Sequence, residues 1–364
     1  MRVLIAPDSF KGSLSADRAA AAIARGWSRI RPDDGIVCLP QADGGEGTLD
    51  ALAAGGEVEV HRVEVDLPAG PHSARWLMLP DRTAVVELAE CCGLPLVGTG
   101  MPMTSSTRAV GQAVRAALGA GAVRIQLGIG GSASTDGGAG CLTELGLQIL
   151  DDHGRQVADG GAGLARAVRL DPRRLVAPPV GGVQLLCDVT SSLLGAAGAA
   201  YVFAPQKGAD AEQVEQLDRA LRHWHDLVGG AADAPGAGAA GGTAYGLAAL
   251  WGAQLVPGAN TVAAQTGLAA QIATADVVIT GEGSFDDQSL TGKIPGHVLD
   301  LAGERTEAVR GRAKIVIAGR VSVDPPAVTC ISVSDLAGSV EASLAHPEHW
   351  LQRAGCVAAA LPNP

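Results

Sequence analysis

Short, uninterrupted apolar runs occur near both ends of the chain, and each is followed by a polar loop and then a stretch with helical periodicity. Residues 3–6 and 36–39 form two such runs at the beginning, and residues 277–280 and 314–318 form two more towards the end. A continuous apolar run is typical of a strand that helices cover on both faces of a parallel sheet. The pattern therefore predicts a doubly wound α/β domain that is built from both ends of the chain.

The middle of the chain shows a different pattern. Residues 58–65, 74–79 and 84–88 are predicted to be short strands joined by turns, which favours antiparallel or mixed pairing. Asp210 is placed to cap an amphipathic helix, and the Gly/Ala-rich residues 229–242 are predicted to be a flexible loop. The expected limits are 63–259 for an inserted mixed α/β domain, and 1–62 with 260–364 for the discontinuous domain.

The composition is that of a globular protein rather than of a nucleic-acid binder. The 364 residues suit two domains, and a hydrophobic content of 47% is enough for a sizeable core. The net charge is −11 and no run of Lys or Arg occurs, which argues against nucleic acid as a partner. A phosphate ligand would then need a metal ion and a few local cations for charge neutralisation.

The cysteines indicate a reducing compartment. There are seven, an odd number, and no Cys-x-x-Cys pair occurs, so neither a disulfide framework nor a structural zinc site is expected. The first apolar run is too short for a signal peptide, and no run approaches the ~18 apolar residues of a membrane helix. We therefore expect a cytoplasmic protein with no membrane partner, and a homo-oligomer is compatible with these features.

Five polar loops follow predicted strands, and ligands of open α/β sheets bind at the carboxyl ends of strands. The first loop holds Asp8, Lys11 and Ser13 just before a helix N-terminus, which favours anions. The second holds Asp43 and Glu46 among three glycines, and hard cations such as Mg²⁺ prefer carboxylate oxygens. Each loop also has a structural interpretation, as a helix cap, a solvated charge or an acidic turn.

The third loop, residues 128–140, is rich in glycine and lies between a predicted strand and a predicted helix. Its backbone amides could cradle phosphate. Gly128, Gly130 and Ala133 also match a loose dinucleotide-binding pattern, although no acidic residue ends a clear second strand about 20 residues further on. An NAD-dependent oxidoreductase is therefore the principal alternative enzyme.

The last two loops add carboxylates and lysines. Asp188 follows a predicted strand, with Lys207 downstream, and its carboxylate could accept a proton, bind a metal ion or cap a helix. Glu282, Asp286 and Lys293 surround another strand end. No Gly-x₄-Gly-Lys-Ser/Thr sequence occurs, so the fifth loop is not a Walker-type phosphate loop.

Together, these loops resemble those of the bacterial glycerate kinase family that yields 2-phosphoglycerate. Seven stretches match in family order: residues 6–16 (APDSFKGSLSA), 42–48 (ADGGEGT), 128–140 (GIGGSASTDGGAG), 187–189 (CDV), 204–209 (APQKGA), 241–250 (GGTAYGLAAL) and 279–293 (ITGEGSFDDQSLTGK). The resemblance implies two α/β domains, one of them flavodoxin-like and discontinuous, with an active site in the cleft between them. It also implies phosphoryl transfer from ATP to D-glycerate with Mg²⁺.

Phosphoryl transfer needs positioning and charge neutralisation, so we expect the loop residues to divide into groups. Asp188 or Asp8 would be the base that orients the attacking hydroxyl, and Lys11 would neutralise charge beside it. The residues expected to bind glycerate are Ser13, Asp43, Glu46, Lys207 and Lys293. The residues expected to hold nucleotide phosphates are Gly130, Gly131, Ser132, Asp136, Gly137 and Gly138. The residues expected to bind Mg²⁺ are Glu282 and Asp286.

The sequence departs from the family pattern in two places. Ser134 and Thr135 stand where the family commonly has Thr-Asn, and Thr190, Ser191 and Ser192 replace Asp-Asn-Pro after the Cys-Asp-Val stretch. These departures indicate either an altered substrate preference or simple tolerance at positions around the site. They are also the only support for a second alternative, a non-catalytic ligand sensor or scaffold that retains the fold.

Overall fold

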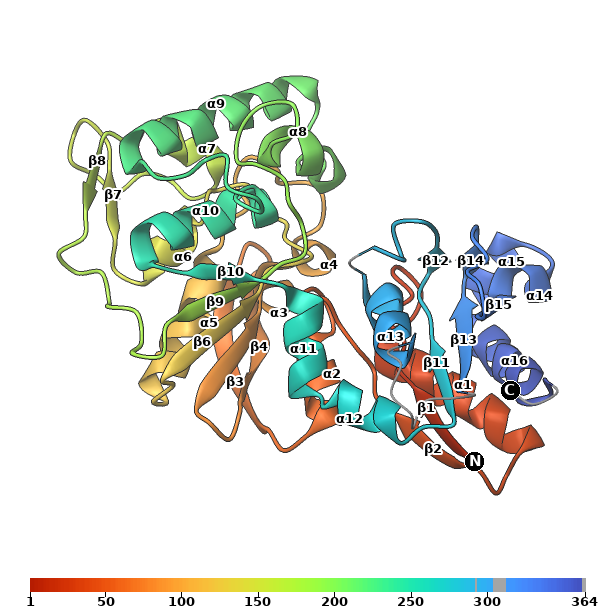
Figure 1. Ribbon diagram of the computed structural model, residues 1–364. Coiled ribbons are helices and arrows are strands. Elements are labelled where there is room, and N and C mark those ends of the chain that lie inside the picture. Colours follow the sequence, from red (N-terminus) through yellow and green to blue (C-terminus); the bar gives the residue numbers. More distant parts are fainter. Residues whose placement is uncertain (292, 304–311, 362–364) are drawn as a thin grey trace. The chain divides into compact units, whose positions relative to one another are not determined.

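The computed structural model describes residues 1–291, 293–303 and 312–361, which belong to two compact units. The first unit comprises Met1–Asp43, Asp50–Gly56 and Ala259–Pro364, and the second comprises Gly44–Leu49 and Glu57–Gly258. The chain therefore starts in the first unit, forms the second, and returns to the first (Figure 1).

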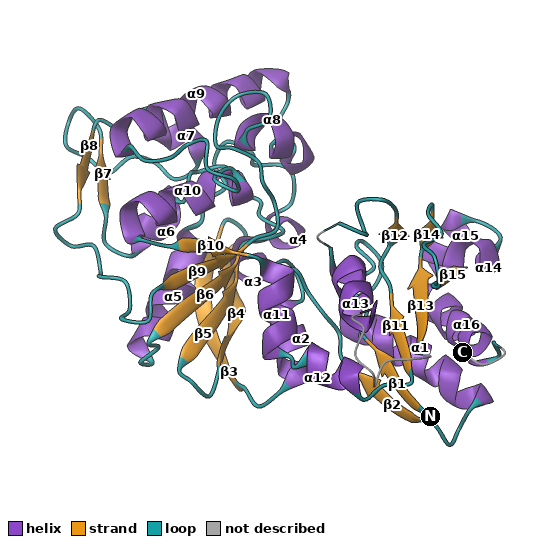
Figure 2. Cartoon of the chain, in the orientation of Figure 1, coloured by secondary structure: helices purple, strands orange, loops and turns teal. Residues whose placement is uncertain are grey.

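A five-stranded parallel sheet forms the centre of the first unit (Figure 2). Its strands in spatial order are β15 (Thr329–Ser332), β13 (Ala313–Ala318), β11 (Val277–Thr280), β1 (Arg2–Ile5) and β2 (Gly35–Cys38). Val3 of β1 lies opposite Val277 of β11, so strands from the two ends of the chain pair directly. This is the strand order of flavodoxin-like sheets, and the predicted fold class is confirmed.

Helices cover both faces of this sheet, because successive side chains of a strand point to opposite faces. Val3 and Ile5 point to one face and Leu4 to the other. The first face carries α1 (Ala16–Ile30) and α16 (Pro347–Ala359), and the second carries α11 (Gly258–Gln265), α12 (Leu268–Ala273) and α13 (Ile294–Gly303). A Cβ on Gly26 would lie 2.0 Å from the backbone oxygen of Gln352, so α1 and α16 pack with their backbones almost in contact.

The remaining elements of the first unit are short. They are β12 (Ser284–Phe285), which pairs in parallel with β14 (Arg320–Val321), and the helices α14 (Val333–Ala337) and α15 (Val340–Ala345). A further helix, α2 (Thr48–Gly55), begins in the second unit and ends in the first.

The second unit is built on a six-stranded mixed sheet. Its strands in spatial order are β10 (Gln254–Val256), β9 (Val183–Leu186), β6 (Arg124–Gly128), β5 (Thr83–Glu87), β4 (Gly70–Met78) and β3 (Glu59–Leu67). The pairs β3–β4 and β4–β5 are antiparallel, as the tight turns between them predict, and the other three pairs are parallel. A separate antiparallel pair consists of β7 (Gln148–Leu150) and β8 (Arg169–Asp171).

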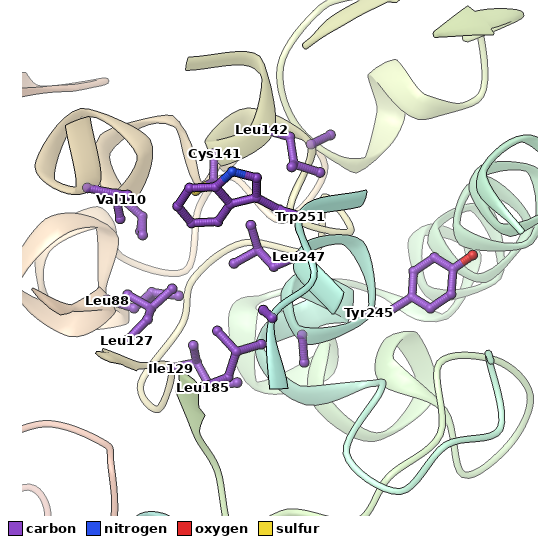
Figure 3. Close-up of a cluster of buried hydrophobic side chains, with 14 of the residues drawn as sticks. Leu88, Val110, Leu127, Ile129, Cys141, Leu142, Leu185, Tyr245, Leu247 and Trp251 are labelled. Atoms are coloured by element: carbon purple, nitrogen blue, oxygen red, sulfur yellow. The ribbon is translucent and has the colours of Figure 1, made fainter. Parts of the chain in front are cut away.

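The helices of the second unit pack against this sheet or against one another, and together they enclose one large hydrophobic core. They are α3 (Leu88–Cys92), α4 (Leu94–Val97), α5 (Arg108–Gly119), α6 (Ala139–Glu144), α7 (Gly161–Leu164), α8 (Ala199–Phe203), the 3₁₀ turn Pro205–Lys207, α9 (Ala211–Val228) and α10 (Ala239–Trp251). Figure 3 shows part of the core, where Trp251 and Leu247 of α10 lie near Cys141. Asp210 caps α9 through a reciprocal capping box with Gln213, as predicted. Among the described helices, none combines the length and the apolar character that crossing a bilayer requires.

The prediction of a flexible loop over residues 229–242 is wrong for its second half. Residues 236–239 are buried, and α10 begins at Ala239. Ala240 and Gly241 have positive φ angles of 52° and 65°, and a Cβ on Gly241 would lie 2.2 Å from the backbone oxygen of Ser134. The small residues are therefore present because backbone packs on backbone, and not because the segment is solvated.

Candidate active site

A cavity of about 460 Å³ lies at the carboxyl ends of β1, β11 and β13, entirely within the first unit. Parallel strands bring their carboxyl ends to one edge of the sheet, so the loops after neighbouring strands meet there. Seven predicted site residues line the cavity, namely Asp8, Lys11, Ser13, Asp43, Glu282, Asp286 and Lys293.

Asp8 lies directly after β1 and is only 6% exposed. Its backbone amide donates to the carbonyl oxygen of Gly281 (2.8 Å), and its Oδ1 accepts a hydrogen bond from the backbone amide of Ser9 (2.6 Å). Burial, followed by the nearby carboxylates of Asp43 and Glu282, raises the pKa of Asp8 from 3.8 to about 7. Asp8 is therefore a carboxyl group that changes its charge near neutral pH.

Glu282 lies after β11 and is 7% exposed. Its Oε1 is buried and has no hydrogen-bond partner in the described part of the chain, and burial raises the pKa of its carboxyl group. The backbone just before it is fixed by close packing, because a Cβ on Gly281 would lie 1.8 Å from the backbone oxygen of Ile317. A buried carboxylate oxygen without a partner is costly, which indicates that a ligand supplies the missing contact.

The cationic side chains of the cavity stand near its carboxylates. The Nζ atom of Lys293 lies 3.8 Å from Glu282 and 3.9 Å from Asp286, and the Nζ atom of Lys11 lies 3.9 Å from Asp43. Lys11 and Lys293 are 77% and 39% exposed at the side chain, so both ammonium groups can move to an incoming anion. The cavity thus offers both oxygen ligands for a cation and positive charges for a phosphate.

Arg320 lines the same cavity and was not among the predicted site residues. It follows Gly319 at the end of β13, and its backbone amide donates to the carbonyl oxygen of Gly283 (3.1 Å). A Cβ on Gly319 would lie 2.4 Å from that oxygen, so glycine is required before the arginine. The same signal that selected the other loops, a polar residue after a buried strand, would have selected this residue too.

The acidic turn after β2 is organised by a residue that was not among the predicted site residues. Glu87, at the end of β5, is 2% exposed and accepts hydrogen bonds from the backbone amides of Gly47 and Leu49 (both 3.1 Å). It therefore supports the N-terminal turn of α2, while the side chain of Glu46 is exposed. A carboxylate within an otherwise apolar strand was the available signal.

In the second unit, the carboxylate of Asp136 holds the loop of residues 128–140 together. It is fully buried and accepts hydrogen bonds from the backbone amides of Thr107 (2.8 Å), Gly138 and Gly140 (both 3.1 Å) and from the Thr107 hydroxyl (2.8 Å). Lys207 is also buried and donates from Nζ to the backbone oxygen of Ser134, and burial lowers its pKa to about 8. Both side chains are turned towards the loop itself.

Several amides of this loop are engaged within the second unit. The amide of Gly130 donates to Gly44 (3.1 Å), that of Gly137 to Gly241 (3.0 Å), and that of Gly138 to the Asp136 carboxylate. Gly131 is exposed. In this conformation Gly130, Gly137 and Gly138 do not offer their amides to a phosphate, and phosphate binding by Gly131 and Ser132 stays a prediction.

Asp188 differs from Asp8 in its surroundings. Its side chain is exposed just beyond the end of β9, and its Oδ1 accepts a hydrogen bond from the backbone amide of Gly258 (2.9 Å). It does not line the cavity of the first unit. Gly292, which belongs to the predicted fifth loop, lies outside the described residues.

Comparison with known proteins agrees with the resemblance. Residues 3–361 match the Glycerate kinase family. The chain is 40% identical over 335 residues to the glycerate kinase of Haemophilus influenzae, which covers 89% of this chain and 87% of that protein. It is 38% identical over 327 residues to the glycerate 2-kinase of Escherichia coli, covering 86% and 85%.

The three-dimensional comparison leads to the same group. A crystal structure from Salmonella typhimurium LT2, assigned as glycerate kinase 2, matches with a TM-score of 0.79 at 36% identity, covering 99% of this chain and 97% of that one. The match spans both units, so the dinucleotide-like pattern at residues 128–133 does not indicate a dehydrogenase. The chain is an enzyme that belongs to the glycerate kinase family.

Proposed function

We propose that this enzyme transfers the terminal phosphoryl group of ATP to carbon 2 of D-glycerate, giving 2-phosphoglycerate and ADP. The observation that carries the proposal is the cavity of the first unit, where the buried carboxyl groups of Asp8 and Glu282 lie among three cationic side chains. Phosphoryl transfer needs this combination, because the nucleophile must be oriented while the charge on the phosphates is neutralised.

Asp8 is the group that we propose as the base. A pKa of about 7 leaves it partly ionised at neutral pH, where it can accept the proton of the attacking hydroxyl as the oxygen–phosphorus bond forms and the bond to ADP breaks. Lys11, Lys293 and Arg320 would bind the phosphates or the glycerate carboxylate. Asp188 remains the predicted alternative base.

The carboxylates of the cavity fit Mg²⁺. The buried Oε1 of Glu282 lacks a partner, and Asp43 and Asp286 supply further hard oxygen atoms. The described ranges contain no group of three or more His, Cys, Asp or Glu side chains that could hold a metal ion by themselves. Proteins usually hold Mg²⁺ with one or two carboxylates together with substrate phosphates. When bound, Mg²⁺ supplies charge neutralisation at the phosphates.

The remaining assignments are also proposals. Glu46 and Ser13 would bind glycerate, and Asp136 and Lys207 would act by holding the loop that carries Gly131 and Ser132. The cleft between two domains that the resemblance implies, and a homo-oligomeric state, stay predictions. A cytoplasmic location is proposed because all seven cysteines are free thiols.

Release of ADP, measured by a coupled assay, tests this proposal. We expect ADP release that requires both D-glycerate and Mg²⁺ and is indifferent to NAD. The variant Asp8→Asn should lower kcat by about 10²- to 10⁴-fold, the usual contribution of a general base. Asp33→Asn, at an exposed position of the same unit, is the matched control and should keep its activity. Near-normal turnover of Asp8→Asn together with loss of activity in Asp188→Asn would move the base to Asp188.

A further inference from the structure

One wall of the cavity in the first unit is apolar, whereas most of the polar and charged side chains come from the loops after β1, β11 and β13. The apolar wall, as we name it, is formed by side chains from α14, α15 and α16: Val333, Val340, Leu344, Pro347 and Leu351. No predicted site residue belongs to it, and the reaction proposed for the charged side of the cavity does not use it.

The apolar wall is held firmly by its surroundings. Val333 and Leu351 are 3% and 1% exposed and belong to the core between the sheet and α16. The short helix α15 is fixed at its start, where the hydroxyl of Ser339 accepts from the amide of Ala342 (3.1 Å), and the indole of Trp350 donates to the Ala342 carbonyl oxygen (3.1 Å). The wall is therefore formed before any ligand arrives, which lowers the entropic cost of binding.

Leu344 is the exposed part of this wall. Its side chain is 55% exposed, which leaves a large apolar group open to water beside the cavity. Covering such a group with a flat apolar ligand is favourable in proportion to the area removed from water.

Glycerate is a poor match for the apolar wall. Each of its three carbons carries oxygen, so it has no apolar face to bury, and it fills only a small part of about 460 Å³. A nucleoside has a flat base of low polarity, and the volume lies in the usual range of ligand sites. A nucleotide would also bring a polyanionic tail, for which Lys11, Lys293 and Arg320 of the same cavity provide positive charge.

We propose that the apolar wall is the nucleoside subsite of this enzyme and binds the base and ribose of ATP. This inference rests on the proposed ATP-dependent reaction. It places the whole nucleotide in the first unit, with the base on α14–α16 and the phosphates towards the loops after β1, β11 and β13. On this inference the phosphates lie at these loops and not at the site predicted for Gly131 and Ser132 of the second unit.

The test compares ATP with inorganic tripolyphosphate, which has the same charged tail and no nucleoside. In titration calorimetry with Mg²⁺, Leu344→Asn should weaken ATP binding about tenfold, as expected for the loss of a buried aliphatic contact. Binding of tripolyphosphate and the KM for D-glycerate should not change. Leu344→Met, which keeps an apolar side chain, should restore ATP binding.

Val357→Asn provides the matched control, because Val357 is an exposed apolar residue of α16 (37%) that does not line the cavity. It should bind ATP as the parent does. Equal ATP affinities of Leu344→Asn and the parent would overturn the inference, as would a parallel loss of ATP and tripolyphosphate binding or a parent that does not bind ATP.

The two proposals can fail separately. If ATP drives phosphorylation of D-glycerate but Leu344→Asn binds ATP normally, the nucleoside subsite is wrong and the proposed function stands. If ATP binding depends on Leu344 but glycerate is not phosphorylated, the subsite stands and the proposed function is wrong.

Discussion

Replacing Asp8 by asparagine is expected to stabilise the first unit at neutral and alkaline pH while removing activity. Asparagine has nearly the same shape, and its Oδ1 can still accept the hydrogen bond that the amide of Ser9 donates to Asp8. The substitution therefore removes a buried charge without removing that hydrogen bond.

The size of the effect follows from the pKa of Asp8. Its folded value of about 7 lies above its ordinary value of 3.8, so the folded protein holds the proton more tightly than the unfolded chain does. The contribution of protonated Asp8 to the free energy of unfolding is therefore fully present below pH ~4 and is lost as the pH rises through ~7. The ionisation constants differ by about a thousandfold, which corresponds to on the order of 4 kcal/mol.

Urea unfolding of the parent and of Asp8→Asn between pH 4 and pH 8 measures this difference. The two proteins should be similar at pH 4, and the variant should gain stability relative to the parent as the pH rises, with most of the gain between pH 5 and 8. Asp33→Asn should follow the parent. Added Mg²⁺ should reduce the gap at pH 8, because a bound cation stabilises the ionised carboxylate. Parallel pH profiles of parent and Asp8→Asn would show that folding does not raise the pKa of the Asp8 carboxyl group.

Three other predictions concern the packing and charges around the site. Gly281→Ala should lower the free energy of unfolding by about 1–3 kcal/mol or more, because its Cβ would lie 1.8 Å from a backbone oxygen of β13. Gly56→Ala is the control, because the space around Gly56 is open, and equal urea midpoints of the two variants would contradict the prediction. Lys207→Met should destabilise the second unit by about 3 kcal/mol, because it leaves the buried Asp136 without its nearby cation. An unchanged urea denaturation curve would show that the second unit does not need the positive charge of Lys207. Glu282→Gln should raise the Mg²⁺ concentration for half-maximal activity about tenfold or more, whereas Asp287→Asn, at an exposed position, should not change it. The same dependence of activity on Mg²⁺ in both variants would show that Glu282 does not bind the metal ion.

Much of the first unit could be predicted from the sequence, because its information is local. Apolar runs such as residues 277–280 indicate buried strands, and polar residues after them indicate a site at the carboxyl edge of the sheet. Asp8 and Glu282 lie 274 positions apart in the chain. They share a cavity because β1 and β11 are parallel neighbours, and the pattern of strands and loops was sufficient to predict that the two loops meet.

Other features of the site depend on information that is not local. In sequence, Asp136 cannot be distinguished from an aspartate that supports a bound phosphate. Only the structure shows that the carboxylate oxygens of Asp136 accept hydrogen bonds from backbone amides of its own loop. Leu344 and Leu351 follow ordinary helical spacing, so no pattern separates the residue that lines a cavity from one that only fills the core. Glu87 acts on a turn about 40 residues earlier in the chain, and that contact exists only once β5 is in place.

Phosphorus NMR of the product made from D-glycerate, ATP and Mg²⁺ measures both the proposed reaction and the carbon that is phosphorylated. We predict ADP and one new phosphate ester whose signal is a doublet, because carbon 2 of glycerate carries a single proton. A triplet would place the phosphate on carbon 3, which carries two protons, and would contradict the proposed product. Absence of any new ester under conditions in which the protein is folded and binds ATP would contradict the proposed reaction itself.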